Sequence, residues 1–169
     1  MATATASRGA RLFKTKNDLP EDMRSQLVNL LNERLADGID LQSQLKQAHW
    51  NLKGPNFIAL HELFDEIHAG VTGYVDTIAE RAVQLGGKAE GTIRLVAERS
   101  EMPEYPPRAV KDLDHAEAIA SALAAFGERV RRNIDEADEL GDKNTADLFT
   151  EVSRGTDKWL WFVEAHLEK

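Results

Sequence analysis

The chain has 169 residues, no cysteine, 21 basic and 29 acidic side chains, and an apolar share of 42%, which is typical of one soluble domain. The absence of cysteine excludes disulfides, a thiolate nucleophile, cysteine-ligated zinc and iron–sulfur clusters. Any metal must therefore bind to histidine and carboxylate side chains. No apolar run is long enough to span a membrane, and the start of the chain lacks the apolar segment of a secretory signal, so we expect a cytoplasmic protein.

The first 17 residues are basic, whereas the rest of the chain is acidic. Residues 1–17 contain no acidic side chain, and the remainder holds 17 basic and 29 acidic residues, a formal charge of −12. The basic residues of this arm are Arg8, Arg11, Lys14 and Lys16. A short basic arm of small polar residues is typical of a flexible segment that can neutralise DNA phosphates. A flexible leader without this function and an organelle transit peptide are the alternatives.

Apolar residues recur at helical spacing in four long segments. Asp18, Pro20 and Glu21 fit the start of a helix, with Asp18 as its cap and Glu21 at capping-box spacing. Glycine and proline residues separate the segments. The predicted helices span about 19–52, about 56–85, a run from Val110 to Ile134, and a run between Gly141 and Leu167.

The connections between these helices differ in length. Short turns follow the first and third helices, which predicts two antiparallel hairpins, whereas the stretch from Gly86 to Pro107 is long enough to return along the bundle. The second and third helices can then run parallel. Residues 92–99 are predicted to form a short helix within this crossover. We therefore predict an all-α four-helix bundle over residues 18–169, preceded by a flexible basic arm over residues 1–17.

Metal-binding side chains follow one face of the second predicted helix. They are His61, Asp65, Asp76 and Glu80. At about 100° per residue this stripe points away from the apolar face of the same helix. A solvated polar face is one interpretation. Apolar and small residues on the same face favour burial against a partner instead.

One helix cannot bring the two ends of this stripe to one metal ion, because His61 and Glu80 lie about 28 Å apart at 1.5 Å per residue. Two antiparallel copies crossing near residues 70–71 would place His61 opposite Glu80 and Asp65 opposite Asp76. Two equivalent sites would result around a two-fold axis.

Small residues at the crossing would let the two copies of the helix approach closely. Among them we expect Gly70 and Gly73 to serve this packing. Across the first hairpin, His49 and His61 are equally distant from Pro55, so these two imidazoles should lie side by side. Mixed nitrogen and oxygen ligands suit iron. The predicted ligands are His49, His61 and Asp65 from one subunit with Asp76 and Glu80 from its partner.

Several segments together carry a family resemblance. They are residues 46–57 (KQAHWNLKGPNF), 61–66 (HELFDE), 76–81 (DTIAER), 145–147 (TAD) and 159–162 (WLWF). The chain resembles the Dps family, the DNA-binding proteins from starved cells, over nearly its whole length. The resemblance implies a ferritin-like four-helix bundle that assembles into a hollow homododecamer. Ferroxidase sites are then expected at its two-fold interfaces.

The resemblance also implies an activity. In this family, the positions matching the five predicted ligands bind ferrous ions, which are oxidised preferentially by hydrogen peroxide, and ferric oxide is stored inside the shell. Paired one-electron donors can reduce peroxide to water without releasing hydroxyl radical. Trp50 beside the site is a candidate electron donor, and a packed interfacial aromatic is the alternative.

Acidic pores on the three-fold axes are a further implication of the resemblance. The candidates near the last turn are Glu139, Asp142 and Asp147. Negative pores would attract ferrous ions. An ordinary solvated turn is the alternative, and Lys143 stands where relatives often have another acid.

Family members that condense DNA often use a basic N-terminal arm. The resemblance therefore favours sequence-independent binding of double-stranded DNA, and a nucleoid location, through the four basic residues of the arm. An iron-storage particle without DNA binding is the second hypothesis.

A third hypothesis is a di-iron enzyme with its site inside each bundle. Asp65-x-x-His68 and Asp112-x-x-His115 superficially match the helical pairs of such sites. The expected Glu-x-x-His pairs are missing from the sequence, which argues against this hypothesis.

Overall fold

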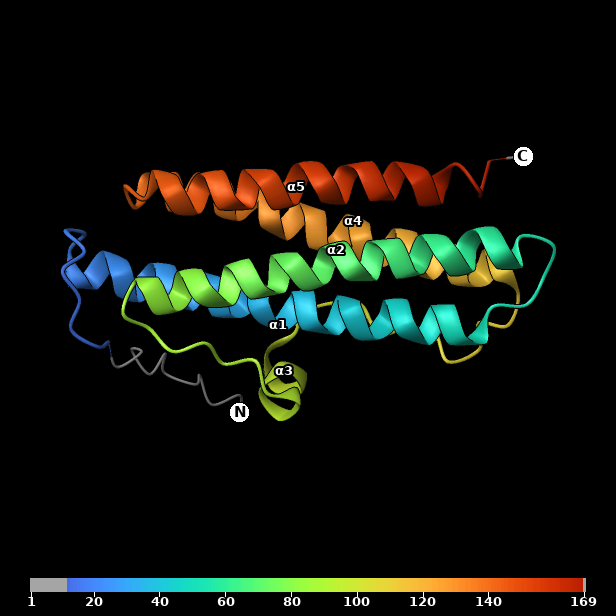
Figure 1. Cartoon of the computed structure of the whole chain (residues 1–169), viewed down its shortest axis with the longest axis horizontal. Helices are drawn as coiled ribbons and strands as arrows, with labels where there is room; N and C mark the ends of the chain where they lie inside the picture. Colours follow the sequence, from blue (N-terminus) through green and yellow to red (C-terminus); the bar gives the residue numbers. More distant parts are fainter. Residues whose placement is uncertain (1–11, 169) are drawn as a thin grey trace, which may run out of the picture.

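The computed structural model describes residues 12–168, which form four long helices and one short helix (Figure 1). The elements are α1 (Glu21–Asn51), α2 (Phe57–Gln84), α3 (Ile93–Arg99), α4 (Asp112–Glu139) and α5 (Lys143–Glu164). No strand occurs between residues 12 and 168. The all-α prediction and the short crossover helix are confirmed, because periodic apolar faces and glycine or proline breaks locate helices well.

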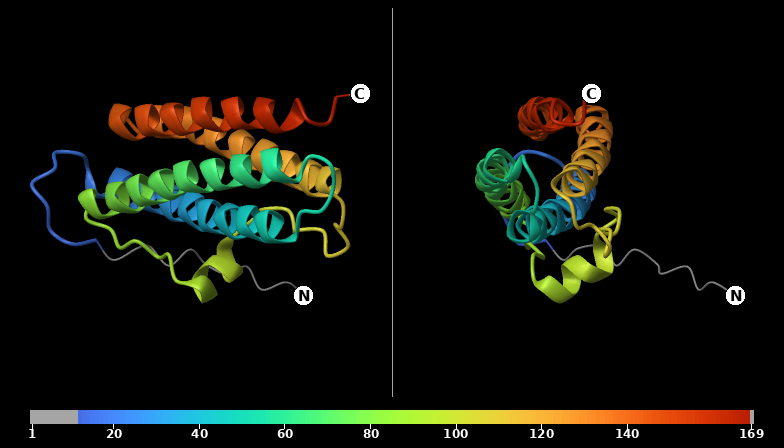
Figure 2. Two further views of the ribbon diagram at one scale, coloured as in Figure 1. Left: turned by 45° about the vertical axis from the view of Figure 1, so that its right-hand side comes forward. Right: turned by 90° about the vertical axis from the view of Figure 1, so that its right-hand side faces the viewer.

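The long helices form two antiparallel hairpins joined by the crossover. α1 pairs with α2, and α4 pairs with α5 (Figure 1). The end-on view in Figure 2 shows α3 outside the bundle, where it packs on α1. The crossover returns from the end of α2 to the opposite end of the bundle, so α2 and α4 run in the same direction, as predicted.

The core consists of the inward apolar faces of the four long helices. The largest fully buried side chains include Phe64, Phe126 and Phe149, one each from α2, α4 and α5, and α1 contributes a row of leucines. Burial of one such ring contributes about 1.5–3 kcal/mol relative to leaving it exposed. The polar stripe of α2 is left outside this core.

The first helix begins without the predicted side-chain cap. Pro20 precedes α1, and no side chain between residues 12 and 168 caps its first N–H groups, so the predicted capping role of Asp18 is wrong. Arg24 fixes this end of the helix instead. Its Nε donates to the Leu19 carbonyl at 3.0 Å and its Nη1 to the Leu85 carbonyl at 2.9 Å, which ties the start of α1 to the end of α2.

Residues 12–17 lie against the same end of the bundle. The Phe13 N–H donates to the Gly86 carbonyl at 2.6 Å, and Leu12 packs against the core. Gly86 has φ +86°, and a Cβ there would lie 2.6 Å from the Phe13 carbonyl oxygen. Glycine is therefore required by both conformation and space. The division at residue 17 between arm and bundle stays a prediction.

Buried polar side chains of α1 hold the crossover in place. Asn32 accepts from the Glu90 N–H at 2.9 Å and donates to the Lys88 carbonyl at 3.0 Å. Asp37 accepts from the Glu101 N–H at 2.9 Å. Burial raises the pKa of Asp37, against the lowering effect of the Glu101 hydrogen bond. These bonds satisfy backbone groups that the irregular crossover cannot pair with itself.

Candidate metal centre

The α1–α2 hairpin brings two histidines together at one end of the bundle. The rings of His49 and His61 stack with centroids 3.6 Å apart and planes inclined by 21°. Nδ1 of His49 lies 2.9 Å from the His61 carbonyl oxygen, and Nδ1 of His61 lies 3.1 Å from the His49 carbonyl oxygen. The predicted adjacency of the two imidazoles is therefore observed.

These reciprocal contacts fix the tautomer of both rings. A carbonyl oxygen only accepts hydrogen bonds, so each Nδ1 must carry its proton and each Nε2 keeps a lone pair when the ring is neutral. Metal-binding histidines commonly donate their second N–H to a backbone carbonyl in this way. Each carbonyl that holds a ring belongs to the other histidine, so the hairpin turn positions both nitrogen donors at once.

Asp65 lies one turn after His61 on α2 and joins this cluster. Its Oδ1 is 3.4 Å from Nδ1 of His49 and 2.7 Å from the Lys46 Nζ. The hydrogen bond from Lys46 is the largest cause that lowers the pKa of Asp65. The carboxylate is thus charged at neutral pH, and Lys46 is its counter-ion. A cation that binds to Asp65 must compete with the Lys46 ammonium.

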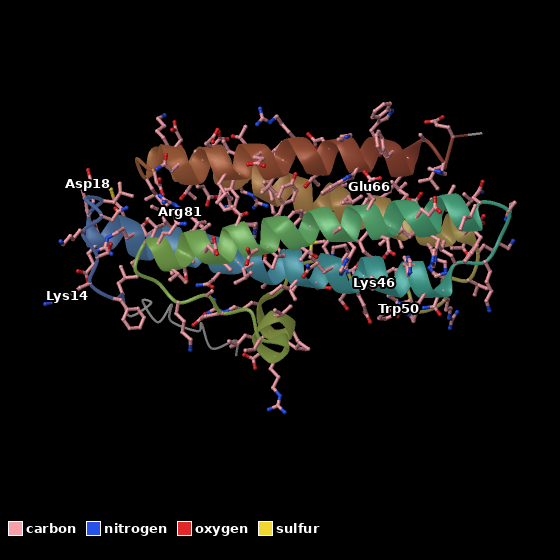
Figure 3. All side chains as sticks on the ribbon, in the orientation of Figure 1. Lys14, Asp18, Lys46, Trp50, Glu66 and Arg81 are labelled. Atoms are coloured by element: carbon pink, nitrogen blue, oxygen red, sulfur yellow. The ribbon has the colours of Figure 1, made fainter. Side chains whose placement is uncertain are left out.

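Trp50 borders the cluster and is 69% exposed. The Lys46 Nζ lies 5.8 Å from its ring centroid, within the range of a cation–π contact. Figure 3 labels Lys46 and Trp50 along α1. Phe57 and Ile58 at the start of α2 are also exposed. This apolar surface beside charged ligands is suited to cover by another protein surface.

The other two predicted ligands lie apart from this cluster. Asp76 and Glu80 are exposed on the second half of α2. Within residues 12–168 of one chain, no three histidine or acidic side chains are placed to hold a metal ion. The structure therefore brings together His49, His61 and Asp65, and it leaves the two carboxylates of α2 at a distance.

A groove lies beside Asp76 on the second half of α2. It is bounded by α1, α2 and the crossover, and its lining includes Ile39, Thr72, Gly73, Asp76 and Ala79. A Cβ at Gly73 would meet no atom within 4 Å, so this glycine leaves open space on the surface of the chain.

Gly70 does not share this role. A Cβ there would lie 2.1 Å from the ring of Trp159, so Gly70 makes room for the chain's own α5. The expectation that Gly70 serves the pairing of two α2 helices is wrong, because Trp159 already covers it within the chain.

The side chains suggested for a site inside the bundle have other functions. The Asp112 carboxylate accepts hydrogen bonds from the Asn56 N–H at 2.8 Å and from the Leu113 N–H at 3.0 Å. It thereby joins the α1–α2 turn to the start of α4. His115 contacts the hydroxyl of Tyr105. Within residues 12–168, neither Asp65 with His68 nor Asp112 with His115 belongs to a group of three side chains that could hold a metal ion. This argues against the intra-bundle di-iron hypothesis.

The three pore candidates differ in their surroundings. Glu139 and Asp147 are exposed, whereas Asp142 is 3% exposed. Both Asp142 oxygens accept from Nη2 of Arg81, at 2.9 and 2.8 Å, and Oδ1 also accepts from the Asn144 N–H at the start of α5. Burial alone would raise the pKa of Asp142, but hydrogen bonds from Thr145 and Arg81 outweigh it and lower the pKa.

The Arg81–Asp142 ion pair was not predicted from the sequence. The two residues are 61 positions apart, and the pair joins α2 to the start of α5. The carboxylate of Asp142 is therefore occupied inside the chain. Only Glu139 and Asp147 have carboxylates exposed at this turn among the three candidates.

The basic arm falls largely outside the described part of the chain. Arg8 and Arg11 lie outside residues 12–168. Lys14 and Lys16 are exposed on the segment that the Phe13–Gly86 hydrogen bond attaches to the bundle. Within residues 12–168, no helix is apolar over enough of its length to cross a membrane.

Comparison with known proteins defines the class. A ferritin-like domain model matches residues 28–169. A solved structure of Dps from Mycobacterium smegmatis superposes with a TM-score of 0.89 at 31% identity, covering 94% of this chain and 96% of that one. DpsC from Streptomyces coelicolor gives a TM-score of 0.90 at 30% identity, covering 98% and 97% of the two chains. The fold is thus that of a ferritin-like four-helix bundle.

Sequence relatives narrow this class to one family. A DNA protection during starvation protein of Agrobacterium fabrum is 48% identical over 159 residues, which cover 94% of this chain and 98% of that protein. A protein of the same name from Brevibacillus brevis is 36% identical, covering 82% of this chain and 93% of its own length. The chain belongs to the Dps family of DNA protection during starvation proteins.

Proposed function

We propose that two copies of the chain pair antiparallel along α2 and form two shared sites that oxidise ferrous ions. In each site, His49, His61 and Asp65 come from one chain, and Asp76 and Glu80 come from the partner subunit. The observation that supports this proposal is the fixed tautomer of the two imidazoles beside Asp65. One chain supplies a prepared half of a site, and the remaining carboxylates lie too far along the same helix to complete it.

Ferrous iron is the substrate of this reaction. Nε2 of each histidine and the carboxylates of Asp65, Asp76 and Glu80 are donors suited to it. Binding to Asp65 displaces the Lys46 ammonium, so the carboxylate exchanges one cationic partner for another. Two ferrous ions each lose one electron, and one hydrogen peroxide takes up two electrons and two protons to give two waters. This pairing avoids the one-electron reduction that releases hydroxyl radical.

We further propose that the chain assembles into a hollow homododecamer that stores the ferric product. The exposed apolar surface at Trp50 and the groove beside Asp76 support burial between copies. Glu139 and Asp147 are the pore candidates with exposed carboxylates. Light scattering should give a mass near twelve times the 18.8 kDa of one chain. A stable dimer or monomer would contradict the shell.

The deciding experiment for the oxidase is anaerobic. The purified assembly is loaded with ferrous iron, hydrogen peroxide is added, and ferric absorbance is followed together with a spin trap for hydroxyl radical. We expect about two irons oxidised per peroxide with little trapped radical, and oxidation faster than in buffer. Glu66→Gln is the matched control for substitutions of Asp65. Glu66 is an exposed neighbour of Asp65, and Figure 3 labels it on the side of α2 away from α1. Oxidation at the buffer rate would overturn the proposal.

We also propose that the assembly binds double-stranded DNA without sequence preference through the arm, and that it is cytoplasmic and nucleoid-associated. The support is the family and the four basic residues Arg8, Arg11, Lys14 and Lys16 in an otherwise acidic chain. Gel retardation should weaken steeply with salt. Replacing all four residues by glutamine should abolish it, whereas Arg94→Gln on exposed α3 should not. Retardation that survives the fourfold change would favour iron storage without arm-mediated DNA binding.

A further inference from the structure

Tyr105 and His115 form a hydrogen-bonded pair that the proposed iron oxidation does not use. Tyr105 lies in the crossover after α3, and His115 lies in the first turn of α4. The Tyr105 hydroxyl contacts Nδ1 of His115, and the ring centroids are 6.1 Å apart with planes inclined by 23°. A phenol in contact with an imidazole can lose its proton to that base as it loses an electron.

Both partners are in the protonation state that such a reaction needs. Burial raises the pKa of Tyr105 to about 12, so its phenol keeps the proton at neutral pH. Burial also lowers the pKa of His115, against the opposing effects of the Asn51 backbone carbonyl and the carboxylates of Asp114 and Asp112. The neutral imidazole can accept the phenolic proton at Nδ1.

His115 has the means to hold the transferred proton. It is 1% exposed, and its Nε2 completes no hydrogen bond within residues 12–168. The Asn51 carbonyl is nevertheless close enough to favour the charged ring. Proton transfer would therefore place the imidazolium against an existing carbonyl dipole, which offsets part of the cost of charging a buried group.

The last turn of α1 links the pair to the proposed iron site. Asn51, whose carbonyl acts on His115, directly follows Trp50 and is two residues beyond His49 in the last turn of α1. The last turn of α1 thus carries a ligand of the half-site, an exposed indole and the carbonyl that faces the Tyr105–His115 pair. The last turn of α1 therefore connects the half-site to the Tyr105–His115 pair.

We propose that Tyr105, with His115 as its proton acceptor, is a second redox site that reduces one-electron oxidants escaping from the iron reaction. This proposal rests on the proposed function, because the reaction of iron with peroxide supplies the oxidant. A hydroxyl radical, or an indole radical formed from Trp50, takes one electron from Tyr105 while the phenolic proton passes to Nδ1 of His115. The hydroxyl radical becomes hydroxide, and the indole radical regains its electron and takes a proton from water.

The resulting tyrosyl radical is reset by the substrate of the enzyme. A ferrous ion gives up one electron and becomes ferric, and His115 returns the proton to the phenolate oxygen. The cycle consumes one ferrous ion for each radical removed. It therefore protects whatever lies near the shell from oxidants that the paired two-electron reaction fails to intercept.

The chain contains a matched control, because Tyr74 is its only other tyrosine. The Tyr74 ring lies 5.6 Å from the ring of Trp159, so it too has an indole neighbour. Within residues 12–168 its hydroxyl makes no hydrogen bond to a histidine or any other base. Tyr74 therefore lacks the acceptor that makes oxidation of Tyr105 favourable.

The first test needs no iron. Pulse radiolysis with azide radicals oxidises exposed tryptophans of the full-length assembly, and the decay of the indole radical and the growth of tyrosyl absorbance are followed. We expect growth in the unmodified protein and in Tyr74→Phe, and none in Tyr105→Phe. His115→Leu should slow the growth by about a hundredfold, the usual contribution of a positioned base. The unmodified protein should also react more slowly in D2O than in H2O.

Equal tyrosyl growth in Tyr105→Phe and the unmodified protein would overturn the proposal, as would equal rates in H2O and D2O. The solvent comparison uses the unmodified chain, so the test does not depend on the folding of the His115 variant. A second measurement adds peroxide to the ferrous-loaded assembly and records both the ferric absorbance and, by electron paramagnetic resonance, the tyrosyl radical. Radical transfer in the first test without iron oxidation in the second would contradict the proposed ferroxidase and leave the redox pair standing.

Discussion

The two halves of α2 are constructed differently. In the first half, His61 and Asp65 have partners within their own chain: a backbone carbonyl for the ring and the Lys46 ammonium for the carboxylate. In the second half, Asp76 and Glu80 are exposed beside a groove of small and apolar side chains. In the proposed shared site, each chain fixes its own directional nitrogen donors, whereas the less directional carboxylates of Asp76 and Glu80 would be positioned by contact with the partner subunit.

Mixing two inactive variants tests this division most strongly. Asp65→Asn and Asp76→Asn should each abolish rapid peroxide-driven iron oxidation, because every shared site contains both positions. When the two variants are unfolded together and reassembled in equal amounts, about half of the two-fold pairs are mixed, and each mixed pair contains one intact site. We expect about a quarter of the unmodified activity to return, measured by the rate of ferric absorbance.

Reassembly of each variant alone is the control, and it should restore nothing. Sites contained within single chains would give no recovery on mixing. The Glu66→Gln chain mixed with either variant reports the dilution expected for an intact partner.

The Arg81–Asp142 pair should be the most sensitive point of the second half for stability. Asp142→Ala leaves the Arg81 guanidinium buried without its partner, which we expect to cost about 3–5 kcal/mol in the free energy of unfolding. Denaturant unfolding at fixed protein concentration measures the loss. Arg81→Met combined with Asp142→Leu removes both charges and should recover much of the stability. A loss below 1 kcal/mol in Asp142→Ala, roughly the value of an exposed pair, would show that the pair is not buried in solution.

The same pair predicts a direction for the effect of pH. The folded-state pKa of Asp142 is lowered from its ordinary value of 3.8, so the carboxylate contributes stability that is fully present above that ordinary value. The contribution is lost as the pH falls through the lower, folded-state pKa. In acid, the difference in stability between the unmodified chain and the Asp142→Ala variant should disappear, because the protonated carboxyl also leaves the Arg81 guanidinium without an anionic partner.

Two glycines three residues apart on α2 should respond in opposite ways. Gly70→Ala places a Cβ against the Trp159 ring and should destabilise the chain by about 1–3 kcal/mol. Gly73→Ala meets no atom within 4 Å in its own chain and should raise helix stability by about 0.5–1 kcal/mol. If two α2 helices cross here, Gly73→Ala should weaken the two-fold contacts of the assembly, and analytical ultracentrifugation measures its dissociation on dilution. Unchanged dissociation of the assembly would place the crossing elsewhere.

The sequence predicts the helices and the histidine pair because both depend on local regularities. Apolar periodicity and glycine or proline breaks locate each helix, and equal distances from the turn at Pro55 bring His49 beside His61. The sequence does not reveal the Arg81–Asp142 pair or the Trp159 contact of Gly70, since both join segments more than sixty residues apart. The expected Asp18 cap fails for a related reason: Arg24, held by the distant Leu85 carbonyl, fixes that end of α1.

Lys46 offers the smallest and most specific test of the comparison, because its effect is confined to the first half of α2. Its ammonium is bonded to Asp65, and the two side chains are 25% and 53% exposed. A pair this exposed is worth about 0.2–1 kcal/mol, so Lys46→Met should tighten ferrous binding by about 1.4- to fivefold, measured by anaerobic calorimetry. Lys53→Met, which removes an exposed charge from the nearby turn, is the matched control. Equal gains in both variants would mean that overall charge, and not competition at Asp65, sets the affinity of the half-site for iron.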